Sequence, residues 1–136
     1  RNIALSSFRF LLSQIFNENG IEVVSNKNWL QKGQKAGKYG EQPIDVAYTL
    51  LTLEAFYDEF GEETFYVNLR TAFNWFLGKN RLMQIVYNPC TGGCYDGLEE
   101  NQVNLNQGAE STLSYLMARL SIQKYIDSLS QTMHHA

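Results

Sequence analysis

Four stretches of the chain carry apolar residues at helical spacing, and polar segments rich in glycine and asparagine separate them. The predicted helices contain residues 5–16, 44–60, 62–78 and 107–126. We expect Gly20 to end the first helix, Gly61 the second and Gly78 the third, because glycine readily adopts the left-handed conformation found at helix C-termini. The pattern therefore predicts an all-α protein.

The second predicted helix is apolar nearly all the way round, which is typical of a buried helix. Pro43 fits its first position, and the carboxylate of Asp45 suits the positive end of the helix dipole. We expect one core that contains Leu50, Leu51, Phe73, Phe76, Leu113 and Leu116.

Two short β-prone segments follow helices, "IEVV" at residues 21–24 and "LMQIVY" at residues 82–87. Each precedes a long polar loop and a helix that begins near a glutamine, so the chain repeats itself after roughly sixty residues. Such a repeat indicates an array of helical hairpins, and stacked repeats need neighbours to cover their apolar faces. Because the chain begins with Arg1 rather than Met, we expect residues 1–136 to be one domain from the C-terminal part of a larger protein. We also expect it to associate with itself or with the preceding part of that parent.

Composition excludes several classes of partner. The 136 residues carry a net charge of −3 and show no basic stripe, so nucleic acid is not expected. No apolar run approaches the roughly 20 residues of a membrane span, and no signal-peptide pattern opens the chain.

Cys90 and Cys94, without a nearby histidine, are too few for a zinc site. We expect them to be reduced thiols in a cytoplasmic protein, with a local disulfide as the alternative, and we predict no metal and no cofactor.

The long loops concentrate groups that suit a sugar. The carboxylates are Asp45, Asp96 and Glu110, the amides are Gln42, Asn104, Asn106 and Gln107, and the aromatic rings are Trp29, Tyr39 and Tyr95. Carboxylates and amides bond sugar hydroxyls, and the C–H face of a pyranose packs on a ring. A pair of carboxylates is also the minimum for glycoside hydrolysis. Composition of this kind is a weak signal, because many loops contain such residues.

Helix capping and turn formation explain most of these residues equally well. Asn106 suits an N-cap, Glu110 suits a capping box, and Asp96 suits a turn closed by its own side chain. Gly108 fits these explanations less well, since glycine in the first turn of a helix costs about 1 kcal/mol against alanine. A close approach of the backbone to a neighbouring helix or to a ligand would require it.

Three segments of the chain resemble the C-terminal region of bacterial proteins described as glycosyltransferases, in which a helical domain of the six-hairpin glycosidase type follows a transferase domain. The segments are "GQKAGKYGEQPIDVAYTLLTLEAF", "FNWFLGKN" and "YNPCTGGCYDGLEENQVNLNQGAESTLSYL". The resemblance covers residues 21–120. It implies an α/α-toroid in which loops and the N-termini of inner helices line a saccharide-sized cavity. Together with the β-prone segments above, the predicted fold is an all-α toroid with short β segments in its long loops. The residues that match the family's motif positions are Gln42, Asp45, Asp96, Gly97, Asn106, Gln107, Glu110 and Ser111.

The residues and the resemblance together predict a carbohydrate-active domain. The predicted catalytic residues are Asp96, Glu110 and Asp45, and the predicted substrate-binding residues are Gln42, Trp29, Tyr95, Gly97, Asn106, Gln107 and Ser111. Three functions stay open: a glycosidase-like portion of an enzyme, a non-catalytic module that binds a saccharide, and a helical interaction or scaffold domain. Enzymatic activity is therefore uncertain at this point.

Overall fold

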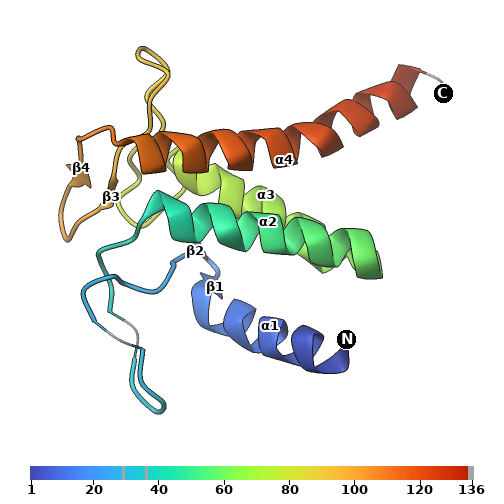
Figure 1. Cartoon of the computed structure of the whole chain (residues 1–136), viewed down its shortest axis with the longest axis horizontal. Helices are drawn as coiled ribbons and strands as arrows, with labels where there is room; N and C mark the ends of the chain where they lie inside the picture. Colours follow the sequence, from blue (N-terminus) through green and yellow to red (C-terminus); the bar gives the residue numbers. More distant parts are fainter. Residues whose placement is uncertain (29, 36, 135–136) are drawn as a thin grey trace.

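The computed structural model of the chain describes residues 1–28, 30–35 and 37–134. Its helices are α1 (Asn2–Ile15), α2 (Pro43–Phe60), α3 (Glu63–Phe76) and α4 (Ala109–His134). Its strands form two antiparallel hairpins, β1 (Phe16–Asn17) with β2 (Gly20–Ile21) and β3 (Gly97–Leu98) with β4 (Val103–Asn104). Successive helices alternate in direction, so the N-terminal ends of α2 and α4 lie at the same end of the molecule, next to β3 and β4 (Figure 1).

The predicted six-hairpin α/α-toroid is wrong. The described residues contain four helices, which do not close into a ring (Figure 1). α2 packs against both α3 and α4, and α1 covers another side of α2 through Phe8, whose ring centroid lies 4.4 Å from that of Phe56. The toroid was expected from the resemblance, whereas the internal repeat indicated only an array of helical hairpins. Neither of these sets the number of hairpins in this chain.

Local sequence signals place the ends of α2 correctly and those of α1 incorrectly. Pro43 is the first residue of α2, and Gly61 ends it with a φ of 67° and an N–H donated to the Tyr57 carbonyl at 2.8 Å. α1 was expected to extend to Gly20 but ends at Ile15, because the next residues turn back in the β1–β2 hairpin. The φ of 125° at Gly20 serves this hairpin, where the residue pairs with Asn17.

The short β segments form largely at other positions than predicted. Within residues 21–24 only Ile21 belongs to a strand. Residues 82–87 form no strand, and only Tyr87 pairs, as an isolated bridge with Cys94. The β3–β4 hairpin was not predicted, because it is a two-residue pairing inside a loop without apolar alternation.

One hydrophobic core fills the space between the helices. Leu50, Phe73 and Phe76 are buried as predicted, and Leu51 is half-buried. The predicted burial of Leu113 and Leu116 is wrong, since these side chains are 59% and 45% exposed.

Small residues on α4 explain why its leucines face outward. Ser114, Ala118 and Ser121 are buried, which allows the helix backbone to lie close to its neighbours. The aromatic anchor of this face is Tyr115, whose ring stacks on that of Tyr87 with 4.0 Å between centroids. Farther along, the Ser121 hydroxyl donates a hydrogen bond to the Glu54 carboxylate on α2.

Cys90 is exposed and Cys94 is buried, and neither forms a disulfide. Burial, with a smaller contribution from the charge of Asp96, raises the pKa of the Cys94 thiol to about 12, so this thiol stays protonated and unreactive. A search of the described residues finds no helix with the length and hydropathy of a membrane span.

Candidate functional site

Two long loops meet at the end of the molecule where α2 and α4 begin (Figure 1). Glu41, two residues before the start of α2, pairs with Leu98 of β3. The Leu98 N–H donates to the Glu41 carbonyl at 2.9 Å, and the Glu41 N–H donates to the Leu98 carbonyl at 3.1 Å. Gly97 permits this contact, because a Cβ atom there would lie 2.2 Å from the Glu41 carbonyl oxygen and the φ of 138° disfavours a side chain. The predicted substrate-binding residue Gly97 therefore has a defined structural role, and its contact with a ligand stays a prediction.

Asp96 organises the start of α4. Its Oδ1 atom accepts hydrogen bonds from the Gly108 N–H at 2.8 Å and from the Ser111 hydroxyl at 2.7 Å, and its Oδ2 atom accepts one from the Asn106 side-chain amide. Partial burial alone would raise the pKa of Asp96, but these bonds outweigh burial and lower it. The carboxylate is therefore held ionised beside the positive end of α4, as a capping group supplied from another loop.

Helix capping by nearby side chains did not explain why a glycine stands at position 108. The contact with Asp96 explains it. A Cβ atom on Gly108 would lie 2.9 Å from Asp96 Oδ1. The predicted close approach is therefore made by a carboxylate of the same chain. Asn106 was expected to cap α4 directly, whereas the helix begins at Ala109 and Asn106 acts through its amide bond to Asp96.

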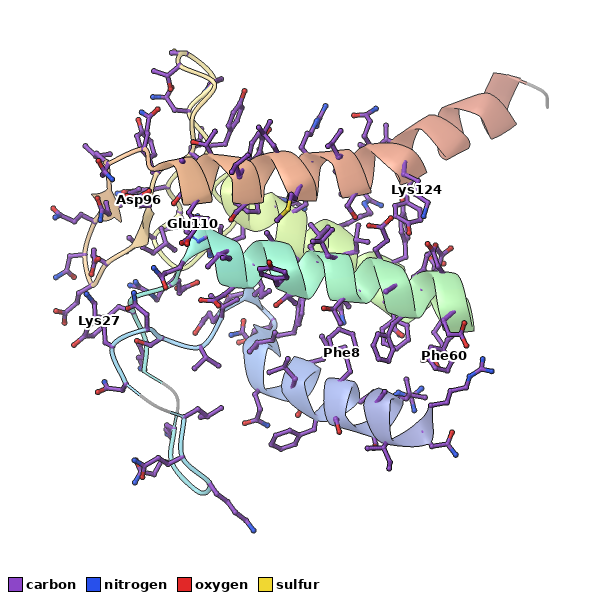
Figure 2. The ribbon with its side chains drawn as sticks, viewed as in Figure 1. Phe8, Lys27, Phe60, Asp96, Glu110 and Lys124 are labelled. Carbon is purple, nitrogen blue, oxygen red and sulfur yellow. The ribbon has the colours of Figure 1, made fainter. Side chains whose placement is uncertain are left out.

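A polar hollow of about 350 Å³ lies between the N-terminal ends of α2 and α4. It is lined by Asn26, Gly40, Glu41, Gln42, Asp96, Glu99, Asn104, Gly108, Ala109, Glu110 and Ser111. Figure 2 shows Asp96 and Glu110 close to one another at this end of the molecule. Four predicted site residues, Gln42, Asp96, Glu110 and Ser111, are thus brought together, and the charged residues of this lining are all acids.

Asp45 does not line this polar hollow but a neighbouring, apolar one. It lines an apolar hollow of about 260 Å³ between α1 and α2, together with residues such as Phe8 and Tyr48. Partial burial raises the pKa of Asp45, and the nearby negative charge of Glu110 raises it further. The two predicted catalytic carboxylates Asp45 and Glu110 are therefore near enough to interact electrostatically.

The other predicted site residues are engaged elsewhere or lie outside the described residues. The Gln107 side-chain oxygen accepts a hydrogen bond from the Thr91 hydroxyl at 2.7 Å, and the Tyr95 hydroxyl accepts one from the Asn88 amide at 2.9 Å. Both bonds turn these side chains toward the loop at residues 88–95. Trp29 is not among the described residues.

Sequence reasoning missed Glu41 as a site residue. The residue is 3% exposed and is among those that line the hollow, and its carboxylate accepts a hydrogen bond from the Trp75 indole N–H at 2.9 Å. Arg81 lies beside it, with 3.4 Å between Arg81 Nε and Glu41 Oε1. In the sequence, Glu41 is marked only by its position before Gln42 and Pro43 at the start of a predicted helix. An exposed acid can occupy this position as well as a buried one.

The part of the chain that the structure describes holds no group of three or more histidine, cysteine or acidic side chains placed to bind a metal ion. Comparison with known proteins adds no assignment: no protein-family model matches the chain, and no curated protein is significantly similar to it. The arrangement of the side chains therefore carries the functional argument.

Proposed function

We propose that this chain binds a saccharide in the polar hollow between the N-terminal ends of α2 and α4. The observation that carries the proposal is the convergence of Gln42, Asp96, Asn104 and Glu110, from two separate loops and two helix starts, on one hollow. A volume of about 350 Å³ falls within the range of small-molecule sites, roughly 300–1,000 Å³. Carboxylates and amides supply the acceptors and donors that sugar hydroxyls require.

Binding is favoured over cleavage because Asp96 is a poor proton donor and Asp45, the predicted catalytic carboxyl group with a raised pKa, lines the neighbouring apolar hollow instead of this one. A carboxylate that accepts three hydrogen bonds and has a lowered pKa is a poor proton donor, and a glycosidase needs one carboxyl group that donates a proton. Catalytic roles for Asp45, Asp96 and Glu110 stay predictions, which analysis of the products after incubation with oligosaccharides tests directly. A cytoplasmic location is part of the same proposal, since it would keep Cys90 and Cys94 reduced.

Calorimetric titration with the strongest ligand from a glycan array tests the binding proposal. The variants Gln42→Ala and Glu110→Gln each remove hydrogen-bonding capacity from the hollow. Since one hydrogen bond contributes about 0.5–1.5 kcal/mol, each variant is expected to weaken binding roughly two- to tenfold. The matched control is Glu63→Gln, an exposed acid in the first turn of α3, whose N-terminus lies at the opposite end of the molecule. Equal affinities for all of these proteins would contradict the site.

We propose a second role for the outer face of α4, as a contact between two copies of the chain. Leu113, Leu116, Met117 and Leu120 are spaced to form one apolar stripe, and each is at least 36% exposed. Their spacing is symmetric about the middle of the stripe, so an antiparallel second copy would place Leu113 against the partner's Leu120.

Light scattering tests this contact. The wild-type chain is expected to dimerise at high concentration, and Leu116→Glu is expected to be monomeric. Leu77→Glu is the control, because Leu77 is 46% exposed and Leu116 is 45% exposed but Leu77 follows α3. A wild-type chain that is monomeric at hundreds of micromolar would contradict the proposal.

A further inference from the structure

Glu41 occupies an unusual position for an acid. Its backbone joins the two loops by pairing with Leu98, and the residue is among those that line the polar hollow although its side chain is only 2% exposed. A carboxylate in such a place needs partners that offset the loss of water. The Trp75 indole N–H donates to Oε2 at 2.9 Å, and Arg81 Nε donates to Oε1 at 3.4 Å.

Arg81 connects this carboxylate to the rim of the hollow. Its Nη2 atom donates to the Glu99 carbonyl at 2.6 Å, and its Nη1 atom donates to the Glu100 carbonyl at 2.8 Å. These two carbonyls belong to the turn between β3 and β4. One guanidinium group therefore fixes the buried carboxylate and the β3–β4 turn at the same time, as its planar fork of donors allows.

The carboxylate of Glu41 keeps capacity for a ligand. An ionised carboxylate offers about four lone-pair positions, and Trp75 and Arg81 occupy two of them. We propose that Glu41 accepts hydrogen bonds from ligand hydroxyls at the floor of the polar hollow, that Trp75 and Arg81 position it, and that its protonation weakens binding in mildly acid solution. This inference rests on the proposed saccharide binding and names a pH control of the same site.

The groups around Glu41 set the pH at which this change occurs. Burial raises the pKa of Glu41 to about 6, while the Trp75 hydrogen bond and the Arg81 charge act in the opposite direction and the negative charge of Glu22 adds to the rise. The other acids of the hollow are Asp96, Glu99 and Glu110. Above pH 6 the ionised Glu41 accepts ligand hydroxyl hydrogens through charge-assisted hydrogen bonds, whereas below pH 6 a proton occupies one acceptor position and the charge that strengthens these bonds is gone.

The size of the effect follows from the ionised fraction. With a pKa of about 6, roughly nine-tenths of the Glu41 side chains are ionised at pH 7 and roughly one-tenth at pH 5. If only the ionised form accepts the ligand, affinity falls about tenfold between pH 7 and pH 5.

The experiment measures affinity for three neutral hexasaccharides (malto-, cello- and manno-) between pH 5 and pH 8. The wild-type chain is expected to show the tenfold fall, and Glu41→Gln, whose amide does not titrate, is expected to show a flat profile. Arg81→Met removes a charge that lowers the pKa of Glu41, so the midpoint of its profile should move to higher pH. Lys27→Gln is the control, because Lys27 pairs with Glu99 on the same rim at 3.3 Å without contacting Glu41, and its midpoint should not move.

Each outcome decides the inference. Binding that is equally tight at pH 5 and pH 7, or an unchanged pH profile in Glu41→Gln, overturns it and leaves the proposed saccharide binding intact. Absence of binding to all three hexasaccharides across the pH range overturns both. If Glu41→Gln does not fold, the shift of the midpoint in Arg81→Met against Lys27→Gln decides, and equal midpoints in these two variants overturn the inference.

Discussion

Replacement of Asp96 by alanine should destabilise the protein by about 2–3 kcal/mol. The carboxylate accepts hydrogen bonds from the Gly108 N–H, the Ser111 hydroxyl and the Asn106 amide. A hydrogen bond to a charged group contributes about 1.5–3 kcal/mol, and loss of a capping side chain costs about 0.5–2 kcal/mol. Because Asp96 is only half-buried, water replaces part of what is lost, which places the expected total below the sum of the three bonds.

Denaturant unfolding of four proteins tests this value. Asp96→Asn keeps one acceptor oxygen and should lose about 1–2 kcal/mol, less than Asp96→Ala. Glu100→Ala, which alters an exposed acid on the same hairpin, should stay within about 0.5 kcal/mol of the wild type. Hydrogen exchange of the Gly108 and Thr112 amides should accelerate in Asp96→Ala, because the first turn of α4 loses its cap.

The pH dependence of the same variant supplies an independent check. The folded pKa of Asp96 is lowered, so its contribution to stability is present above its ordinary pKa of 3.8 and is lost as the pH falls through the folded value. The difference between the wild type and Asp96→Asn should therefore shrink in acid. A loss for Asp96→Ala that equals that of Glu100→Ala would refute the capping role.

Three further predictions follow from the packing and the charges. Leu50 is fully buried, so Leu50→Ala should lower the free energy of unfolding by about 2–5 kcal/mol. Leu113 is exposed, so Leu113→Ala should lower it by less than about 0.5 kcal/mol. Thermal or denaturant unfolding measures both values, and similar losses would contradict the assigned faces of α2 and α4. Gly97→Ala should lower stability more than Gly92→Ala, because the new methyl group at 97 would collide with the Glu41 carbonyl oxygen. Gly92 has a φ of 75° and open space around it, so alanine there costs only about 1–2 kcal/mol of backbone strain. The reverse order of stabilities would contradict the contact between the loops. Glu41 has a pKa of 4.5 in its ordinary environment and about 6 when folded, so the stability it contributes is fully present below pH 4.5 and about 2 kcal/mol is lost as the pH rises through 6. Unfolding of the wild type at several pH values should show this decrease in the free energy of unfolding, and Glu41→Gln should show no such decrease. An equal decrease in the variant would mean that another group causes it.

The sequence predicted those features that neighbouring residues decide. Pro43 and Gly61 limit α2 through their own backbone preferences, so both ends of this helix were found. The buried face of α4 was not found, because Leu113 and Leu116 have the stronger hydrophobicity while Ser114 and Ala118 are selected by how closely the helices pack. Which of the two faces is buried depends on the neighbouring helices and not on periodicity.

In the candidate site, too, contacts between residues that are near in the sequence could be predicted and contacts between distant residues could not. Asp96 and Ser111 could be proposed together because only one loop separates them, and the structure joins them by a hydrogen bond. The role of Glu41 could not be read from the sequence, since its partners Trp75 and Arg81 lie 34 and 40 residues farther along the chain. The predicted ring of six hairpins was wrong because it was inferred from a resemblance of sequence segments, and such a resemblance does not fix how many helices this chain contains or how they are arranged.

Amide chemical-shift mapping during titration with the three neutral hexasaccharides shows whether the polar hollow binds a saccharide. The shifted amides should cluster at Gln42, at Asp96–Leu98 and at Asn104–Ser111, and the amides near Phe60 at the far end of α2 should not shift. Shifts confined to the outer face of α4, or no shifts at millimolar saccharide, would contradict it.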